Sequence, residues 1–491
     1  MKLFELLKHF PELVVYNPQK LNPNITNITC HSQKVAPGSL FVAKRGAKED
    51  GNRYSIDAVN RGAVVVLTEI INPELNAVQL KSTNILEAEG KLAHVLYGKP
   101  SDTMLMVGVT GTSGKTTTAY AIRHIFEMAK IHSGLIGTVE YIVGGVRIPA
   151  ERTTPDAPTT HQLLYDMAKA GAKAGVMEVS SHALCQGRVE GIEFDIAAFT
   201  NLTHEHLDYH KSMEEYCDAK NLLIRSLVPK ELAAKPHKPK CAVVNSDSPW
   251  LSRFLEGLRV DKLTYSILAQ ADLQAKNIAF SKQKTTFELH YKNRKYSVEI
   301  PLVGLFNVEN MLAAIGVTLA SGLSLDVIIA ACKTFKGPPG RLERVENSKG
   351  LQIYIDYAHK EDALKNVLQT LRPCTKGKLI VVFGCGGDRD REKRPRMGQI
   401  AESLADLVIL TSDNPRSEEP QAIIEEIKKG FKDFQKQYDI LDRKEAIAFA
   451  LSKATAEDIV LIAGKGHEKK QEFFDRVIPF DDVLVAYEAT L

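Results

Sequence analysis

The feature that most constrains this chain is a glycine-rich segment, residues 108–118, which lies between an apolar run and a stretch with helical character. A strand, a glycine-rich loop and a helix in this order allow backbone N–H groups and a helix N-terminus to surround a polyphosphate. Lys115 is then expected to reach the terminal phosphates, and Thr116 to place its hydroxyl on Mg²⁺. Gly108 lies one residue too far upstream for the common G-x4-G-K-[ST] spacing, so an ordinary glycine turn is the alternative. The Gly-Lys-Thr sequence in this setting favours ATP binding.

Composition excludes several other classes of protein. With 491 residues the chain has room for about three domains. The net charge of +3 is too small to indicate a nucleic-acid or anionic-membrane partner. The seven cysteines include no Cys-x-x-Cys pair, so their spacing indicates neither a disulfide framework nor a zinc site. Residues 1–10 read as an amphipathic helix rather than a secretory leader, and no apolar run is long enough to cross a bilayer. We therefore expect a cytoplasmic protein without membrane insertion.

The order of apolar runs and turns predicts an α/β protein of three domains. Residues 1–100 read as a small N-terminal α/β domain, and 101–335 alternate strands and helices as in a doubly wound, mostly parallel sheet. Gly337-Pro338-Pro339-Gly340 cannot continue a helix and is predicted to be a hinge. A second alternating run follows, so 336–491 are predicted to form a Rossmann-like α/β domain.

Polar residues follow several predicted strands of the central domain, where ligands of doubly wound sheets bind. Glu178 ends one strand and could hold the Mg²⁺ of bound ATP; a buried carboxylate paired to Lys115 is the alternative. The segment 200–210 holds three histidines and two carboxylates, but it lacks H-E-x-x-H and any cysteine. A single histidine joining the Mg²⁺ site is favoured over a zinc centre. Nothing in the local pattern distinguishes Lys220 from an ordinary solvated lysine.

Three loops of the last domain, at 383–391, 411–420 and 463–468, are rich in Arg, Asp, Asn and Glu. Each alone would be an ordinary solvated turn, but together at one sheet edge they favour a ligand with both an ammonium and a carboxylate. An ATP domain, a hinge and a zwitterion-binding domain indicate carboxylate activation. In that reaction ATP phosphorylates an acid, and an amine held by the last domain attacks the acyl phosphate.

The ordered motifs of this chain resemble those of the Mur ligase family over essentially its whole length. The motifs are Thr110–Thr116, Glu178–His182, Thr200–Leu202, His206–His210, Ala219-Lys220, Gly304–Asn310, Gly340-Arg341 and Asp356–His359. Thr153–Ala157 further resembles the tripeptide-forming members, which add the third residue to UDP-N-acetylmuramoyl-L-alanyl-D-glutamate in peptidoglycan synthesis. Arg416 in Asp413–Arg416 implies meso-diaminopimelate as that residue, since an arginine can pair its distal carboxylate. The family's usual Asp-Ser-Arg of the first domain appears here as His31-Ser32-Gln33.

The resemblance implies a set of site residues. Those for ATP are Thr110, Gly111, Thr112, Ser113, Gly114, Lys115, Thr116, Thr117, Asn307, Arg341 and His359. Those for the UDP precursor are Cys30, Ser32, Thr153, Thr154, Ser180, Gln186 and Arg188. Those for diaminopimelate are Arg389, Asp413, Asn414, Pro415, Arg416, Gly464 and Glu468. The implied Mg²⁺ ligands are Thr116, Glu178, His206 and Lys220, the last as an N-carboxylated lysine, and Lys115, Lys220, Glu178 and His206 are the implied catalytic residues.

The activity that the resemblance implies is ATP- and Mg²⁺-dependent ligation of meso-diaminopimelate to the D-glutamate γ-carboxylate, with small molecules as partners and a monomer as the expected state. Two alternatives stay open: the same reaction with L-lysine, and a P-loop ATPase that acts as a regulatory switch without ligation. Folate-polyglutamate-type ligation is disfavoured by Asp413–Arg416 and by Thr153-Thr154.

Overall fold

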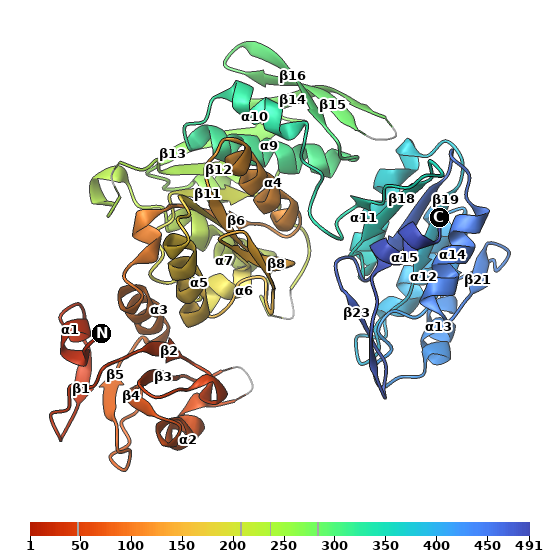
Figure 1. Ribbon diagram of the computed structural model, residues 1–491. Helices are drawn as coiled ribbons and strands as arrows, with labels where there is room; N and C mark the ends of the chain where they lie inside the picture. The colour runs from red at the N-terminus through yellow and green to blue at the C-terminus, as the bar shows by residue number, and fades with distance from the viewer. Residues whose placement is uncertain (47–48, 207–208, 236, 282–283) are drawn as a thin grey trace. The chain divides into compact units, whose positions relative to one another are not determined.

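The computed structural model describes residues 1–46, 49–206, 209–235, 237–281 and 284–491. By its internal contacts the chain divides into two compact units. The first consists of Met1–Gln274 with Asn310–Ile328, and the second of Ala275–Glu309 with Ile329–Leu491. Three larger sheets follow one another along the chain (Figure 1), which confirms the expected α/β class. The domain boundaries at 100 and 335, and the hinge, stay predictions.

The N-terminal sheet has the strand order β1-β5-β4-β3-β2, in which β1 alone runs antiparallel. Its buried side chains divide between two clusters, because successive residues of a strand point to opposite faces. Leu40 and Val42 pack with α1 and α3, whereas Phe41 and Ala43 pack with α2. Both apolar runs expected here, 40–43 and 63–67, are strands. The bounds are α1 Leu3–Leu7, β1 Val14–Tyr16, β2 Asn27–Thr29, β3 Ser39–Ala43, α2 Ser55–Asn60, β4 Ala63–Thr68, β5 Val78–Lys81 and α3 Ile85–Leu96.

The central sheet has the order β16-β15-β14-β13-β12-β11-β6-β10-β7-β8-β9. Strands β13 through β7 in that order are parallel, and β8 and β9 extend the sheet antiparallel. Leu164 of α5 and Leu223 of α7 join Met106 and Phe199 in one cluster, so α5 and α7 cover the same face. Helix α4 contacts β6, β7 and β10.

The elements from β6 to α10 have the following bounds. They are β6 Leu105–Thr110, α4 Lys115–Met128, β7 Ser133–Ile136, β8 Glu140–Val143, β9 Val146–Pro149, α5 Ala157–Lys169, β10 Ala174–Glu178, α6 Ser181–Cys185, β11 Ile196–Phe199, α7 Met213–Arg225, β12 Cys241–Asn245, α8 Leu251–Leu255, β13 Asp261–Ser266, β14 Leu273–Phe280, β15 Thr285–Tyr291, β16 Arg294–Ile300, α9 Leu305–Ala320 and α10 Leu325–Cys332. Residues 285–291 and 295–300 alternate polar and apolar side chains around Lys292-Asn293-Arg294, which predicts a hairpin. Strands β15 and β16 form this hairpin, and Lys292 and Asn293 turn the chain with φ of 47° and 60°.

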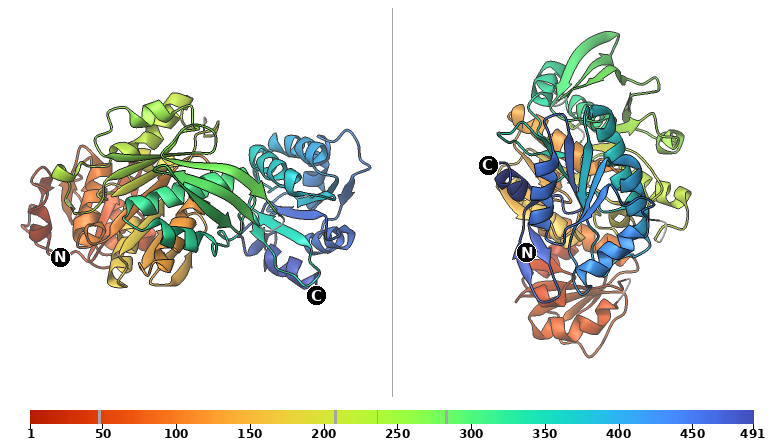
Figure 2. Two further views of the ribbon diagram at one scale, coloured as in Figure 1. Left: turned by 90° about the horizontal axis from the view of Figure 1, so that it is seen from above. Right: turned by 90° about the vertical axis from the view of Figure 1, so that its right-hand side faces the viewer.

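The C-terminal sheet has the order β17-β18-β22-β19-β20-β21, and all its neighbours except β17 pair in parallel. Helices α11, α12 and α13 pack on one face, and α14 and α15 on the other. Figure 2 shows this sheet with helices on both faces. The bounds are β17 Glu343–Arg344, β18 Gln352–Asp356, α11 Glu361–Leu371, β19 Leu379–Phe383, α12 Lys393–Leu404, β20 Leu407–Leu410, α13 Pro420–Lys428, β21 Gln437–Asp439, α14 Arg443–Lys453, β22 Ile459–Ala463, β23 Lys470–Glu472, β24 Val477–Pro479 and α15 Asp482–Glu488.

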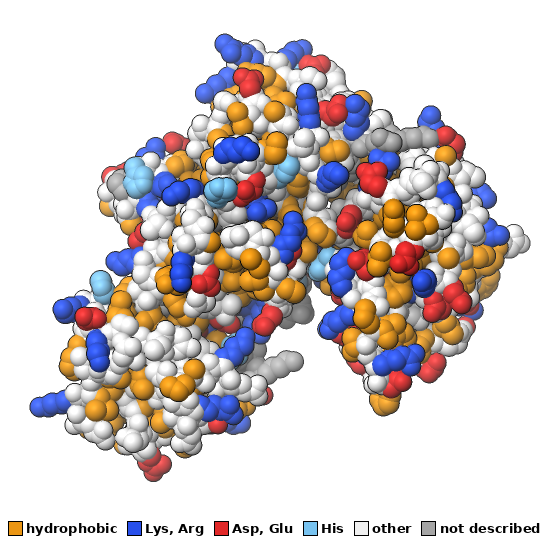
Figure 3. All heavy atoms as spheres, viewed as in Figure 1, with side chains coloured by type: hydrophobic (Ala, Val, Ile, Leu, Met, Phe, Trp, Pro, Cys, Tyr) orange, Lys and Arg blue, Asp and Glu red, His pale blue; other side chains and the backbone are white. Residues whose placement is uncertain are grey.

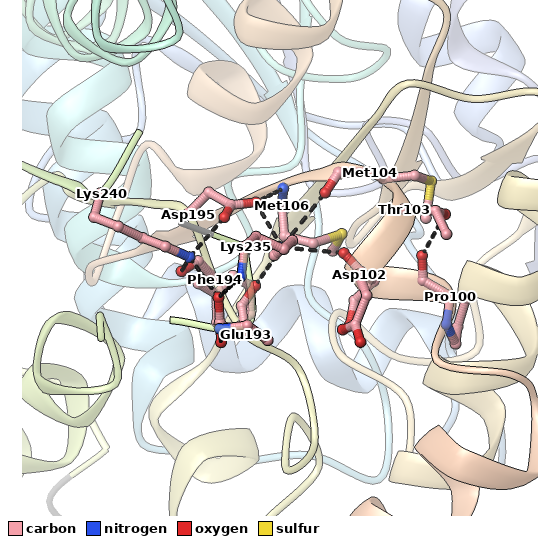
Figure 4. A network of polar contacts seen from close by, with 12 residues as sticks. Pro100, Asp102, Thr103, Met104, Met106, Glu193, Phe194, Asp195, Lys235 and Lys240 are labelled. Carbon is pink, nitrogen blue, oxygen red and sulfur yellow. Dashed lines mark hydrogen bonds and ion pairs between the residues drawn. The ribbon is translucent and has the colours of Figure 1, made fainter. Parts of the chain in front are cut away.

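A buried charge network fixes the start of β6, the strand that leads into the glycine-rich loop (Figure 4). The Asp195 carboxylate accepts hydrogen bonds from the ammonium groups of Lys235 and Lys240, each at 2.7 Å, and from the Met106 backbone N–H. Lys235 also donates to the carbonyl oxygens of Ser101 and Met104, at 3.0 and 3.4 Å. The glycine and proline of segment 98–102 predict a linker between domains. In the structure this segment is held in place, with Ser101 fully buried.

Positive and negative side chains are interspersed over the face drawn in Figure 3, as the small net charge would require. Within the described ranges, no helix combines the length and apolarity that a bilayer crossing demands.

Candidate active site

The glycine-rich loop connects β6 to α4 as the sequence predicts. Two of its glycines have positive φ, 149° at Gly111 and 84° at Gly114. A β-carbon at Gly111 would lie 1.9 Å from Thr200 Oγ1, and one at Gly114 would lie 2.1 Å from Asn310 Oδ1. Both positions therefore require glycine, because neighbouring side chains occupy the space that any other residue would fill.

Residues that directly follow β11 hold the glycine-rich loop in place. Thr200 Oγ1 donates to the Ser113 carbonyl oxygen at 2.6 Å. The Asn201 side-chain oxygen accepts the Ser113 N–H at 2.9 Å, and the Asn201 carbonyl accepts the Thr112 N–H at 2.8 Å. The loop thus has a fixed shape before any ligand binds.

Two lysine ammonium groups share one acceptor at this loop. Lys115 Nζ donates to the carbonyl oxygens of Gly111 and Thr112, both at 2.8 Å. Lys220 Nζ, on α7, donates to the same Gly111 oxygen at 2.7 Å and lies 4.4 Å from the centre of the Tyr216 ring. Lys220 is only 1% exposed. Its burial, together with the nearby charge of Lys115, holds the pKa of Lys220 well below its usual value.

Glu178 lies at the carboxyl end of β10 and is fully buried. Its carboxylate accepts hydrogen bonds from Thr116 Oγ1 at 2.9 Å, from the Thr138 N–H at 2.8 Å and from Thr138 Oγ1 at 2.9 Å. A β-carbon at Gly137 would come within 2.5 Å of Glu178 Oε1. The sequence-predicted pair of Thr116 and Glu178 therefore meets at the N-terminus of α4.

Aromatic and imidazole rings gather beside Tyr216. His206, which has a φ of 57°, lies 4.9 Å from His182 and 6.1 Å from Tyr216, measured between ring centres. The His210 ring nitrogen Nε2 lies 3.0 Å from Ser181 Oγ. Burial raises the pKa of Tyr216 to about 12. His206 and Lys220 thus both lie close to the Tyr216 ring. The role of His206 as a metal ligand stays a prediction, and Leu207 and Asp208 of the same motif are outside the described residues.

The residues expected to bind the UDP precursor gather around Thr154 on the same unit. Thr154 Oγ1 donates to the Glu178 carbonyl oxygen at 2.8 Å and accepts the Ser180 N–H at 3.2 Å. Arg188 donates to the Thr154 carbonyl oxygen at 2.8 Å and to the Gln186 side-chain oxygen at 2.6 Å. Thr153 Oγ1 lies 3.1 Å from Thr138 Oγ1, which connects this group directly to Glu178.

Cys30 and Ser32 follow β2 of the N-terminal sheet. Between them, His31 Nε2 lies 3.3 Å from Asp156 Oδ2, and Asp156 caps the N-terminus of α5. The hydrogen bonds that Asp156 and Cys30 accept raise the pKa of His31 to about 10, and His31 in turn lowers that of Asp156. His31 stands at the position where the family usually has an aspartate. Its partner here is itself an acid, Asp156, at the start of α5.

Two of the three C-terminal loops meet around Gly386 and Gly387. Arg416, with a φ of 51°, donates from Nη1 to the Gly387 carbonyl oxygen at 2.8 Å and from Nε to Glu472 at 3.2 Å. A β-carbon at Gly386 would lie 3.2 Å from Arg416 Nη1 and 3.7 Å from Arg389 Cγ. The two arginines expected to contact diaminopimelate therefore flank the same glycine.

The third loop, residues 463–468, contacts the 411–420 loop through the buried Lys465. Lys465 Nζ donates to Asn414 Oδ1 at 2.9 Å and to Glu468 Oε2 at 3.1 Å, and Asn414 Nδ2 also donates to Glu468 at 2.8 Å. Gly464, with a φ of 113°, lets the Asp413 carboxylate approach, because a β-carbon there would lie 2.5 Å from Asp413 Oδ2. Burial raises the pKa of Asp413. A β-carbon added at Gly387 would lie 1.8 Å from the Pro415 carbonyl oxygen, so Pro415 packs directly against this glycine.

Three residues expected at the nucleotide belong to the second compact unit. Asn307 Nδ2 donates to the Val303 carbonyl oxygen at 2.8 Å, near the start of α9. The Arg341 guanidinium lies 4.9 Å from the centre of the Tyr357 ring, and that ring lies 4.6 Å from His359. Burial lowers the pKa of His359 to about 4, so its imidazole is neutral at physiological pH.

Sequence reasoning left out several residues that shape these sites. Thr138 and Lys465 lie in short loops and Glu472 ends the short strand β23. None of the three has a recognisable spacing, and only their positions after or between strands could have pointed to them. Thr200 and Asn201, by contrast, belong to the Thr200–Leu202 motif that the sequence did single out, and they follow β11 directly.

Comparison with known proteins agrees with this architecture. The Mur ligase family, catalytic domain, matches residues 24–97; the Mur ligase middle domain matches 109–318; and the Mur ligase, glutamate ligase domain, matches 340–466. The chain belongs to the Mur ligase family.

The similar relatives are named as one kind of enzyme. A UDP-N-acetylmuramoyl-L-alanyl-D-glutamate--2,6-diaminopimelate ligase of Bacillus licheniformis is 41% identical over 100% of this chain and 99% of its own length. The ligase of the same name from Chlamydia felis is 42% identical, over 99% of each chain. A solved structure of a ligase with this name has a TM-score of 0.72 at 32% identity, covering 99% of this chain and 98% of its own.

Proposed function

We propose that this protein is an ATP-dependent ligase that joins meso-diaminopimelate to UDP-N-acetylmuramoyl-L-alanyl-D-glutamate in peptidoglycan precursor synthesis. The observation that carries the proposal is the Gly111–Lys115 loop, which hydrogen bonds from Thr200 and Asn201 hold in shape. This loop lies close to Glu178, Thr154 and Lys220. The full-length similarity to diaminopimelate ligases supports the choice of substrates.

The reaction has two steps. The D-glutamate γ-carboxylate oxygen attacks the terminal phosphorus of ATP, the bond to the bridging oxygen breaks, and ADP leaves. The diaminopimelate amine then attacks the acyl carbon, giving a tetrahedral intermediate that expels inorganic phosphate, and the amine loses a proton to solvent. Lys115 would leave the Gly111 and Thr112 carbonyls for the phosphate oxygens, where its charge offsets the charge that develops.

The donor set fits Mg²⁺, which prefers oxygen ligands. Thr116 and Glu178 offer a hydroxyl and a carboxylate 2.9 Å apart at the loop. Lys220 would join them after N-carboxylation, since its lowered pKa leaves a neutral amine able to react with CO₂, and His206 would be the remaining ligand. When bound, the ion neutralises charge on the phosphates of ATP.

In the last domain, Arg416 and Arg389 would bind the distal carboxylate of diaminopimelate, and Glu468 and Asp413 its distal ammonium. An arginine offers two parallel N–H groups to the distal carboxylate of diaminopimelate. L-Lysine has only its α-carboxylate and no distal one, so this loop favours diaminopimelate over lysine. Ligation also requires that the amine reach the acyl phosphate, and we assign that movement to the hinge near Gly340.

The test is a mass-spectrometric product assay with the UDP-muramoyl dipeptide, ATP, Mg²⁺ and either diaminopimelate or L-lysine. We expect the tripeptide product with diaminopimelate and phosphate release only when both the dipeptide and the amino acid are present. Phosphate release without either of them would instead identify a P-loop switch, and product with lysine alone would identify a lysine-adding ligase.

A further inference from the structure

A second group of metal-ligating side chains lies away from the ATP loop, at the joint between the N-terminal and central sheets. Cys30 follows β2, His31 is the next residue, and Asp156 begins α5. One ligand atom from each residue, the Cys30 Sγ, a His31 ring nitrogen and an Asp156 carboxylate oxygen, lies within 4.8 Å of the other two.

The separation between the His31 and Asp156 ligand atoms is close to that of a tetrahedral metal site. At the usual bond lengths of about 2.0–2.3 Å, two ligands of a tetrahedral Zn²⁺ lie about 3.4–3.6 Å apart. His31 Nε2 and Asp156 Oδ2 are already 3.3 Å apart. The Asp156 oxygen Oδ1 accepts the Thr159 N–H at 3.0 Å, so the helix cap holds this carboxylate in place while Oδ2 stays directed at His31.

A buried acid beside the group adds a second, independent observation. Glu89 on α3 is fully buried, and its Oε1 atom has no hydrogen-bond partner in the described structure, while Oε2 pairs with Lys44. Glu89 interacts electrostatically with both Asp156 and His31. A cation among these residues would offset the negative charges of the buried Glu89 and the partly buried Asp156.

We propose that Cys30, His31 and Asp156 bind a zinc-class divalent cation. Thiolate, imidazole and carboxylate together are ligands for Zn²⁺ rather than for Mg²⁺, which favours oxygen alone. Three protein ligands leave a fourth tetrahedral position open. The proposal does not depend on the ligase activity, because it concerns binding of the metal alone.

Cobalt(II) is a suitable probe, since it replaces Zn²⁺ in such sites and gives a sulfur-to-metal absorption band when a thiolate binds. We expect the reduced, full-length protein to develop this band at one equivalent of cobalt and to lose it when Zn²⁺ is added. Binding should also release protons, because thiol and imidazolium must both be deprotonated.

The variants separate this site from adventitious binding. Cys30→Ser should abolish the band, and His31→Gln and Asp156→Asn should each weaken cobalt binding at least tenfold. Asn is as good a helix cap as Asp, so α5 stays formed in Asp156→Asn. Cys185→Ser, which removes an exposed thiol, should leave the band unchanged. An unchanged band in Cys30→Ser, or no band in the unaltered protein at one equivalent, would overturn the proposal.

Discussion

Lys115 and Lys220 donate to the same atom, the Gly111 carbonyl oxygen, from elements far apart in the sequence. Two positive charges on one neutral acceptor repel each other, and burial disfavours the charged form of Lys220 further. Conversion of Lys220 to a carbamate would replace this repulsion with an attraction to Lys115 and to Mg²⁺. The geometry around Gly111 thus favours modification of the buried lysine over that of its neighbour.

We predict that Lys220→Ala lowers kcat at least 100-fold, because the proposed carbamate, an oxygen donor for Mg²⁺, can no longer form. In the unaltered protein, removal of bicarbonate and CO₂ should lower activity reversibly. Intact-protein mass spectrometry under CO₂ should show one added carboxyl group, absent in Lys220→Ala. Lys211→Ala, at an exposed lysine just before α7, is the matched control and should behave like the unaltered protein. Full activity in carefully degassed buffer would contradict the carbamate.

Glu178→Gln should raise the Mg²⁺ concentration for half-maximal activity about tenfold or more. The amide keeps the shape of the side chain but removes the charge that a cation requires, and its NH₂ cannot accept the hydrogen bond from Thr116. Activity is measured against Mg²⁺ at saturating ATP. Glu151→Gln, at a side chain that is 80% exposed, serves as the control. Equal Mg²⁺ curves for both variants would remove Glu178 from the metal site.

Arg416→Ala should raise the KM for diaminopimelate about 10- to 100-fold, the range expected for a charged hydrogen bond. The KM for ATP should change little, because the glycine-rich loop lies on the other compact unit. Arg476→Ala removes an exposed arginine from the neighbouring β23–β24 hairpin and should leave both constants unchanged. If Arg416→Ala raised the two KM values equally, the arginine would act on folding rather than on substrate.

The sequence was sufficient for the elements whose signal is local. The Gly-Lys-Thr loop after an apolar run defined β6 and α4, and the polar pair Lys292-Asn293 between two alternating runs defined the β15–β16 hairpin. The short strands β7, β8 and β9 were not predicted, because four residues carry too little periodicity to be recognised.

The residues that complete the sites depend on contacts that local patterns do not contain. Lys220 reads as a surface lysine of α7 until the helix packs against β6 and β11, and Tyr216 and Gly111 then surround it. Asp156 meets His31 only because α5 packs against β2. Motif resemblance pointed to Lys220, but neither spacing nor resemblance pointed to the His31–Asp156 pair.

The buried network around Asp195 should dominate the stability of the first compact unit. Asp195→Ala leaves the ammonium groups of Lys235 and Lys240 buried without this carboxylate, which costs about 3–5 kcal/mol of unfolding free energy. Urea denaturation, followed by fluorescence, measures the change. Asp57→Ala, which breaks the exposed pair with Arg61, should cost about 0–1 kcal/mol. A loss for Asp195→Ala no larger than for Asp57→Ala would show that the lysines find other partners.

The His31–Asp156 pair should stabilise the protein in a defined pH range. His31 has a pKa of about 10 in the folded protein and about 6.5 unfolded, so its contribution is complete below pH 6.5 and is lost as the pH rises toward 10. The difference in Tm between the unaltered protein and His31→Gln, measured with a chelator present, should therefore narrow from pH 6.5 to 10. A constant difference over this range would mean that His31 is not protonated in the folded state.

Lys235 donates hydrogen bonds to the carbonyl oxygens of Ser101 and Met104, in the segment that connects the N-terminal sheet to the central sheet. A recombinant fragment beginning at Leu105 would lack both carbonyl groups, so the buried ammonium group of Lys235 would lose two hydrogen-bond acceptors. A fragment beginning at Gly98 would keep both acceptors. A fragment intended to fold without the N-terminal sheet should therefore begin upstream of Ser101.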